Sequence, residues 1–127
     1  MTHLIDLDLA ATRLLLDAFN LDVALVRSST LAPRGARTDM LIDLCHRTTT
    51  HVLRVGAGAV TYLDPVALRQ AGITVEVATF THPPYQQHHR GPFVTGLSVL
   101  DLLLHHGPAA RDVLTKGTRL SPWSTAA

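Results

Sequence analysis

The segment Leu63–Phe80, LDPVALRQAGITVEVATF, contains both ends of a short helix and the strand that follows it. Asp64 is a favourable N-cap, Pro65 suits the first helical position, and Gly72 suits the end of the helix. Apolar residues then alternate with polar ones, which predicts a strand over Ile73–Phe80 with one buried face. A helix followed directly by a strand is the repeating unit of an α/β fold.

The same alternation extends toward the N-terminus. Helical periodicity predicts a helix over Leu7–Phe19, and a short β-branched run predicts a buried strand over Asp22–Ser28. A second helix is expected over Thr38–Arg47, with Thr38 as its cap, and a second strand over His51–Val55. The predicted fold class is therefore α/β, with a small three-stranded, mostly parallel sheet and flanking helices.

The chain is predicted to continue with a pair of helices. Ser98 is a suitable N-cap for the run LSVLDLLLHHG, and Asp101 three residues later completes a capping box of the acidic kind. A nucleophile and a base are the alternative roles for these two residues, but their spacing favours the structural role. Gly107 can end this helix, and Pro108 can begin the next one.

Composition predicts one small domain. The chain has 127 residues, of which 46% are hydrophobic, so we expect a core over residues 1–116 and a flexible polar tail over residues 117–127. The net charge of +1 and the scattered basic residues indicate no nucleic-acid footprint. Cys45 is the only cysteine, which excludes an intrachain disulfide. No signal peptide or membrane-spanning apolar run is recognisable, so a cytoplasmic location is expected.

The irregular stretch Phe80–Phe93, FTHPPYQQHHRGPF, is the first candidate for function. His82 would lie at the carboxyl end of the third predicted strand, where its ring could act as an acid, a base or a donor. The prolines restrict the backbone, so His82, Tyr85 and Gln87 lose little entropy when a ligand binds.

The histidines of this region could instead form a metal site. Five of them occur from His82 to His106, but no HxH or HxxxH spacing places two on one face of a helix. Adjacent histidines point in different directions on a regular element, so His88 and His89 are expected to be solvated. No metal site is predicted, and metal binding is the weaker alternative.

The stretch RVGAGAVTYLD, residues 54–64, joins a predicted strand to a predicted helix. Gly56 and Gly58 permit close backbone approach, and open α/β sheets bind ligands at the carboxyl ends of their strands. The third glycine of a dinucleotide fingerprint is absent. A ligand-facing loop and a plain tight turn are equally open interpretations.

Three segments together resemble the WbqC-like family of bacterial proteins: GAGAVTYLDPVALRQAGITVEV, FTHPPYQQHHRGPF and LSVLDLLLHHGPAARDVL. The family pattern contains Tyr-Leu-Asp after a Gly-containing loop, His-Pro-any-Tyr-any-Gln, and a helix that begins with Leu-Ser. The resemblance covers Leu21–Leu114. Gln86 stands where the family often has Pro, and Gly96 stands where it often has Asn. Family members are usually nearly twice as long, so their N-terminal half is expected to be absent here.

The resemblance implies an enzyme of bacterial polysaccharide or specialised-metabolite biosynthesis that transfers a small acyl or aminoacyl group, such as glycyl, to an amine. It implies that His82 is the general base or an oxyanion-side donor. The residues expected to bind the substrate are Tyr85, Gln87, Gly56, Gly58 and Tyr62. The resemblance indicates no particular cofactor.

A non-catalytic subunit is the alternative. Three strands make a narrow sheet with open edges, which a second copy or a partner chain supplying the missing half could cover. The expected partners are therefore a small-molecule or carrier-bound substrate and a second subunit, with no nucleic acid and no membrane.

Overall fold

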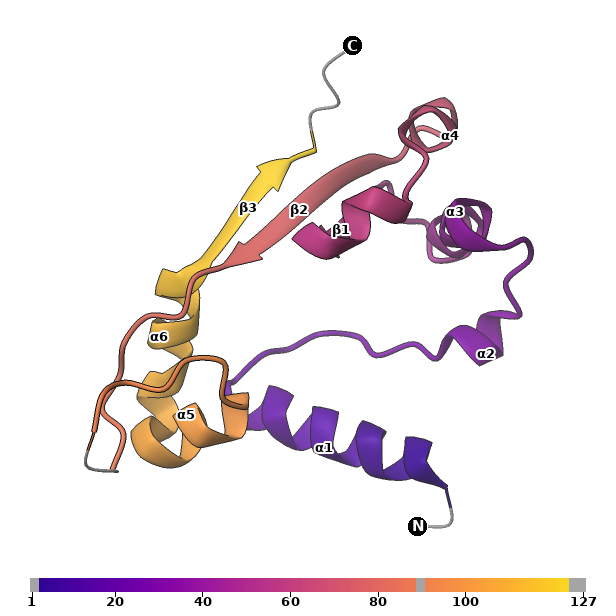
Figure 1. Cartoon of the computed structure of the whole chain (residues 1–127). Coiled ribbons are helices and arrows are strands. Elements are labelled where there is room, and N and C mark those ends of the chain that lie inside the picture. The colour runs from indigo at the N-terminus through magenta and orange to yellow at the C-terminus, as the bar shows by residue number, and fades with distance from the viewer. Residues whose placement is uncertain (1–2, 89–90, 124–127) are drawn as a thin grey trace. The chain divides into compact units, whose positions relative to one another are not determined.

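The computed structural model describes residues 3–88 and 91–123, and the chain divides into two compact units (Figure 1). The helical unit consists of Met1–Ala24 and Thr81–Gly117. The sheet unit consists of Leu25–Phe80 and Thr118–Ala127. The part of the helical unit that contains the histidine motif is therefore inserted in the sequence between two strands of the sheet unit.

The sheet unit contains, in chain order, α2 (Ser28–Leu31), α3 (Arg37–Arg47), β1 (Val52–Gly56), the 3-10 helix η1 (Ala57–Tyr62), α4 (Pro65–Gln70), β2 (Thr74–Phe80) and β3 (Thr118–Pro122). The strands lie in the order β1–β2–β3. β1 and β2 are parallel, with Leu53 opposite Val75, whereas β2 and β3 are antiparallel, with Phe80 opposite Thr118. The α/β class is confirmed, but the sheet is mixed rather than mostly parallel.

The strand predicted over Asp22–Ser28 is wrong. Residues 21–27 are irregular, and Val23 and Val26 are 54% and 58% exposed. β propensity describes how well a side chain fits a pleated, half-buried surface. This run pairs with no strand among residues 3–88 and 91–123, so its β-branched side chains have no such surface.

The third strand is β3, at the start of the stretch predicted to be a flexible tail. Its sequence TRLSP has no apolar face, and all its residues are exposed. Main-chain hydrogen bonds to β2 order it, and these bonds require no particular side chains. Residues 124–127 of the predicted tail lie outside the described residues.

The helix α4 forms as its sequence predicts. Asp64 is the N-cap, and its Oδ1 accepts hydrogen bonds from the N–H groups of Val66 at 2.9 Å and Ala67 at 3.1 Å. Pro65 occupies the first turn, where a missing N–H costs nothing. Gly72 follows the helix with a φ of 72°, a left-handed conformation that favours glycine.

The start of α3 differs from the prediction. The helix begins at Arg37, with Ala36 at the N-cap position, so Thr38 is not its cap. Thr38 is buried instead, and its hydroxyl accepts a hydrogen bond from the N–H of Asp64 at 3.0 Å. A tertiary contact between α3 and the start of α4 therefore replaces the predicted local one.

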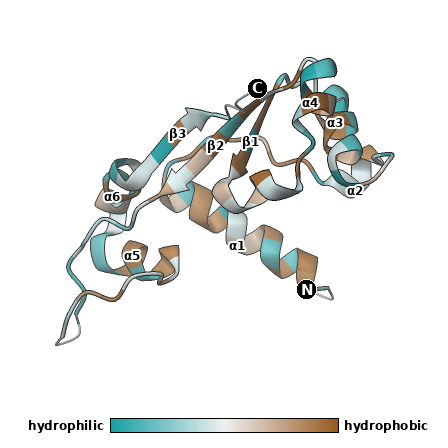
Figure 2. Ribbon diagram, turned by 45° about the horizontal axis from the view of Figure 1, so that its top comes forward, coloured by the Kyte–Doolittle hydropathy of each residue, from teal (hydrophilic) through white to brown (hydrophobic). Residues whose placement is uncertain are grey.

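The core of the sheet unit lies between the strands and the helices α3 and α4. Its buried residues are Cys45, Leu68, Ile73 and Val75, and Leu68 is only 1% exposed. Figure 2 shows hydrophobic colour along much of β1, which contributes partly buried side chains to this core. Burial raises the pKa of the Cys45 thiol, as expected for a core residue rather than a reactive one.

The helical unit contains α1 (Leu4–Ala18), α5 (Val99–His106), the 3-10 helix η2 (Gly107–Ala109) and α6 (Ala110–Gly117). The predicted C-terminal helical pair is thus confirmed. Phe19, Leu102 and Ala110 form its buried core. Partly buried Tyr85 packs against them, so the loop before α5 is part of this unit.

Candidate active-site loop

The loop that carries the histidine motif runs from Thr81 to Ser98, between β2 and α5. It contains no helix or strand in its described residues, 81–88 and 91–98. His82, the predicted base, is the second residue after β2, and its side chain is exposed. Apart from the main-chain bond of Thr81 to Gly117 at its start, the shape of the described part of this loop depends on side-chain contacts.

Tyr85 is the centre of these contacts. Its hydroxyl donates a hydrogen bond to Oδ2 of Asp101 in α5 at 2.6 Å. Its ring makes T-shaped contacts with the rings of Phe93 and His106, at centroid distances of 5.2 Å and 5.5 Å. Burial, and then the Asp101 carboxylate, raises the pKa of Tyr85 above its ordinary value of 10.0. The hydroxyl therefore stays protonated at neutral pH and acts as a donor.

Gln87 joins the two halves of the loop. Its side-chain Nε2 donates to the carbonyl oxygen of Val94 at 2.9 Å, and its Oε1 accepts from the N–H of Val94 at 3.0 Å. An amide side chain that pairs with both polar groups of one residue imitates a strand pairing. Gln87 thereby closes the loop across seven residues.

His105 fixes the same loop from the α5 side. Its Nε2 accepts a hydrogen bond from the main-chain N–H of His88 at 3.0 Å, and its Nδ1 lies 2.7 Å from the carbonyl oxygen of Asp101. The rings of His88 and His105 are 4.9 Å apart and tilted by 30°. Nδ1 of His105 is also 3.5 Å from Oδ1 of Asp101.

The start of α5 combines a cap with this contact. Ser98 is the N-cap, and its Oγ accepts a hydrogen bond from the N–H of Leu100 at 3.2 Å. The N–H of Asp101 donates to the carbonyl oxygen of Ser98 at 2.9 Å. The Asp101 carboxylate is directed at Tyr85 and His105, so Asp101 connects the helix start to the loop.

A model of the WbqC-like protein family matches residues 1–113. The chain belongs to the WbqC-like protein family. The match includes α1, which precedes the Leu21–Leu114 range of the resemblance, and it covers the whole candidate loop. The searches of curated proteins and of solved structures give no significant match.

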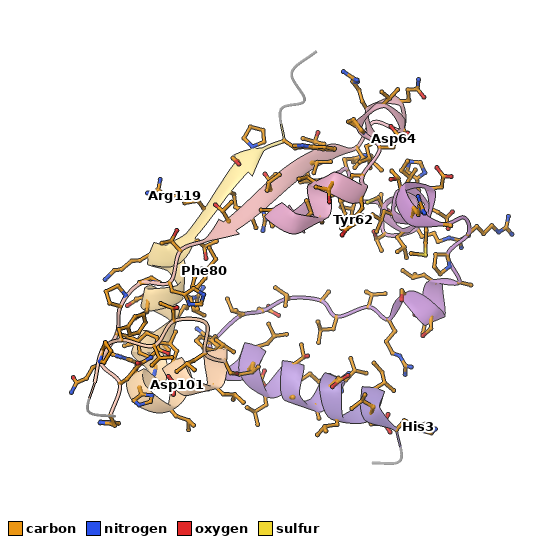
Figure 3. The ribbon with its side chains drawn as sticks, in the orientation of Figure 1. His3, Tyr62, Asp64, Phe80, Asp101 and Arg119 are labelled. Carbon is orange, nitrogen blue, oxygen red and sulfur yellow. The ribbon has the colours of Figure 1, made fainter. Side chains whose placement is uncertain are left out.

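The glycine-containing stretch of this WbqC-like chain lies in the sheet unit. Gly56 ends β1 and Gly58 lies in η1, and a Cβ atom added at either would meet nothing within 4 Å. Tyr62, at the end of η1, is 81% exposed (Figure 3). Tyr62 lines an open depression of about 820 Å³ together with residues 36–41, at the start of α3. Neither glycine lines it.

The residues that the sequence analysis missed are His105 and His106. His105 was grouped with the other histidines, although its i,i+4 spacing from Asp101 could have indicated a contact. His106 has a buried Nε2 without a hydrogen-bond partner among the described residues. The contacts of both histidines depend on how the loop packs on α5. The periodicity of the sequence gives no information about that packing.

Histidine and acidic side chains do not gather into a metal-binding group anywhere in residues 3–88 and 91–123. His88 and His105 contact each other through their rings and a main-chain bond. His89, which the sequence analysis expected to be solvated, lies outside the described residues.

Within the described part of the chain, each helix is too short or too polar to cross a bilayer.

Proposed function

We propose that this WbqC-like protein transfers a small acyl group, of the size of glycyl, to an amine in bacterial polysaccharide or specialised-metabolite biosynthesis. Family membership supports the proposal, as does the set of polar contacts that fixes the histidine motif. The single observation that carries it is the bond from Tyr85 to Asp101, because it holds a protonated hydroxyl of the motif in a partly buried place. Preorganised groups of this kind catalyse without reorganising during the reaction.

The reaction requires an activated acyl donor, such as a thioester or an acyl phosphate. The amine nitrogen attacks the donor carbonyl, a C–N bond forms, and the bond to the thiolate or phosphate breaks. His82, with its exposed imidazole, takes the proton that the amine loses and passes it to the leaving group. No oxidant or reductant is needed.

The other motif residues have supporting roles in this proposal. The Tyr85 hydroxyl donates a hydrogen bond to Asp101, and Tyr85 is among the residues proposed to bind the substrate. Gln87 pairs its amide with the main chain of Val94 and so shapes the loop, and it stays among the residues proposed to bind the substrate. The Tyr62 depression is a second place where a substrate group could bind.

The test is turnover with glycyl thioesters and glycyl phosphates as donors and amino sugars as acceptors, followed by mass spectrometry of the acylated product. His82→Ala is expected to lower kcat by about 100-fold or more, the usual contribution of a general base. His51→Ala, at an exposed histidine of the sheet unit, is the matched control and should keep the wild-type rate. Equal rates for His82→Ala and wild type would exclude His82 as the base, and no product with any donor would contradict the transferase proposal.

A second candidate function is a subunit that pairs with another copy of itself through the sheet. In the described residues, the outer edges of β1 and β3 have no strand partner, and every residue of β3 is exposed. Open edges of this kind are templates for pairing. Light scattering should then give a dimer mass, and Leu120→Lys on β3 should lower it, whereas Leu104→Lys on α5 should not. A monodisperse wild-type monomer would exclude this candidate.

A further inference from the structure

The contacts of His105 determine which of its ring nitrogens carries a proton. A main-chain N–H can only donate, so the Nε2 atom that receives the His88 N–H at 3.0 Å must be unprotonated. The proton of the neutral ring is therefore on Nδ1. That assignment agrees with the Asp101 carbonyl oxygen 2.7 Å away, which can only accept. His105 is thus a neutral imidazole in its Nδ1–H form.

A second proton on His105 would break one of these two bonds. Protonated Nε2 would become a donor facing the His88 N–H, so the bond that anchors the loop would turn into a repulsion. The bond from Nδ1 to Asp101 would persist, because an imidazolium donates from both nitrogens. Protonation therefore breaks the bond from the ring to the loop and keeps the bond from the ring to α5.

The groups that face His105 decide whether this protonation is accessible. From α5 itself, the Asp101 carboxylate lies 3.5 Å from Nδ1. From the loop, the His88 ring lies 4.9 Å away and the Tyr85 ring 6.2 Å away. A charged His88 would oppose a charge on His105, whereas protonated Tyr85 is neutral. His106 is its neighbour in the chain, and its ring packs on Tyr85.

We propose that His105 is a positioning residue whose neutral form anchors the histidine-motif loop through the His88 N–H, and whose protonation frees the loop at His88. The proposal rests on the proposed function only in taking this loop as the active site. Histidine is the side chain whose ordinary charge change falls between about pH 5 and pH 8, so the test covers that range. Protonation of His105 would make the geometry of His82, Tyr85 and Gln87 dependent on pH without any change in these three residues.

Two substitutions separate anchoring from mere packing. Gln at position 105 places an oxygen near the position of Nε2 and accepts from an N–H at every pH, so His105→Gln should keep the loop anchored throughout. His105→Leu removes the acceptor and should release the loop at every pH. His106→Gln is the matched control, because it changes the neighbouring ring and leaves the His88 bond intact.

The test measures hydrogen exchange of the His88 amide by NMR from pH 8 to pH 5, corrected for intrinsic exchange, with the ring ¹⁵N shifts of His105 as the tautomer reading. In wild type and His106→Gln, we expect the Nδ1–H form at pH 8 and about a tenfold loss of His88 protection as His105 gains its proton. The loss should be absent in His105→Gln, and protection should be low throughout in His105→Leu.

Three results would overturn the proposal: an Nε2–H tautomer at pH 8, protection that ignores the protonation of His105, or a pH response in His105→Gln equal to that of wild type. None of these readings requires turnover. If no acyl donor reacts while the pH-dependent protection is present, the transferase proposal fails and the role of His105 stands.

Discussion

The chain has two loops that follow parallel strands, and they are ordered in different ways. After β1, the segment Ala57–Tyr62 forms a 3-10 helix, with one side-chain bond from Thr61 to the Gly58 carbonyl oxygen. After β2, the loop has no regular structure in its described residues and is held by Tyr85, Gln87 and His105. Local backbone geometry orders the first loop, whereas side-chain hydrogen bonds between residues distant in sequence order the second. The second loop therefore carries groups whose chemical state can alter its shape.

The largest expected effects come from the two cores beneath these loops. Leu102→Ala in the helical unit and Leu68→Ala in the sheet unit should each lower the free energy of unfolding by about 2–5 kcal/mol, because both side chains are almost fully buried. Hydrogen exchange by mass spectrometry should localise the loss to the unit that carries the substitution. Equal acceleration in both units for either variant would show that the units unfold as one.

The next effect separates the two tyrosines. Tyr85→Phe removes the hydrogen bond to the Asp101 carboxylate and should cost about 1.5–3 kcal/mol in denaturant unfolding. Tyr62→Phe is the matched control and should cost almost nothing, because the Tyr62 side chain is 81% exposed.

The same pair of variants has a pH signature. The pKa of Tyr85 is raised in the folded state, so its contribution is fully present below the ordinary value of 10.0 and is lost as the pH rises through the folded value. Wild type should therefore lose stability in alkali more steeply than Tyr85→Phe. If the stability of the two proteins fell equally with rising pH, the hydrogen bond from Tyr85 to Asp101 would be contradicted.

A smaller effect compares the two helix caps. Asp64→Ala removes two hydrogen bonds at the start of α4 and should cost about 1 kcal/mol. Ser98→Ala removes a single, longer bond at the start of α5 and should cost less. Thermal unfolding of the two variants shows which substitution lowers stability more. A greater loss of stability in Ser98→Ala would mean that Ser98 also stabilises the loop before α5.

The smallest effect is an acid shift in the sheet unit. The hydrogen bond from Arg47, and then that from the Arg34 main chain, lowers the pKa of Asp43 from its ordinary value of 3.8. Its stabilisation is present above that value and is lost as the pH falls through the folded value. Arg47→Gln should move the acid unfolding midpoint slightly upward, and high salt should reduce the difference. An unchanged midpoint at low salt would exclude this ion pair as a contributor.

Local rules explain which parts of the fold could be predicted from the sequence. Asp64, Pro65 and Gly72 act within one short helix, so α4 and the strand after it were predicted correctly. The strand predicted from Asp22 does not form, because its β-branched residues have no neighbouring strand with which to pair in the described part of the chain. β3 was missed because its order comes from β2, a segment distant in sequence, and not from its own side chains.

The same distinction holds for the candidate loop. Its position, directly after β2, was predicted from the prolines and the end of the strand. The role of Asp101 was predicted only as part of a cap, because its contact with Tyr85 spans sixteen residues. His105 was overlooked because a main-chain N–H as its partner leaves no trace in sequence spacing. The catalytic role of His82 stays a prediction.

The ladder between β2 and β3 ends at the pair Phe80 and Thr118, and the next main-chain bond joins the N–H of Thr81 to the carbonyl oxygen of Gly117 at 3.0 Å. The chain therefore leaves and re-enters the sheet at neighbouring points. A two-residue turn could close the same ladder as an ordinary hairpin. The register between β2 and β3 is therefore independent of the length of the segment that connects them, because that segment begins and ends at one pair of neighbouring positions.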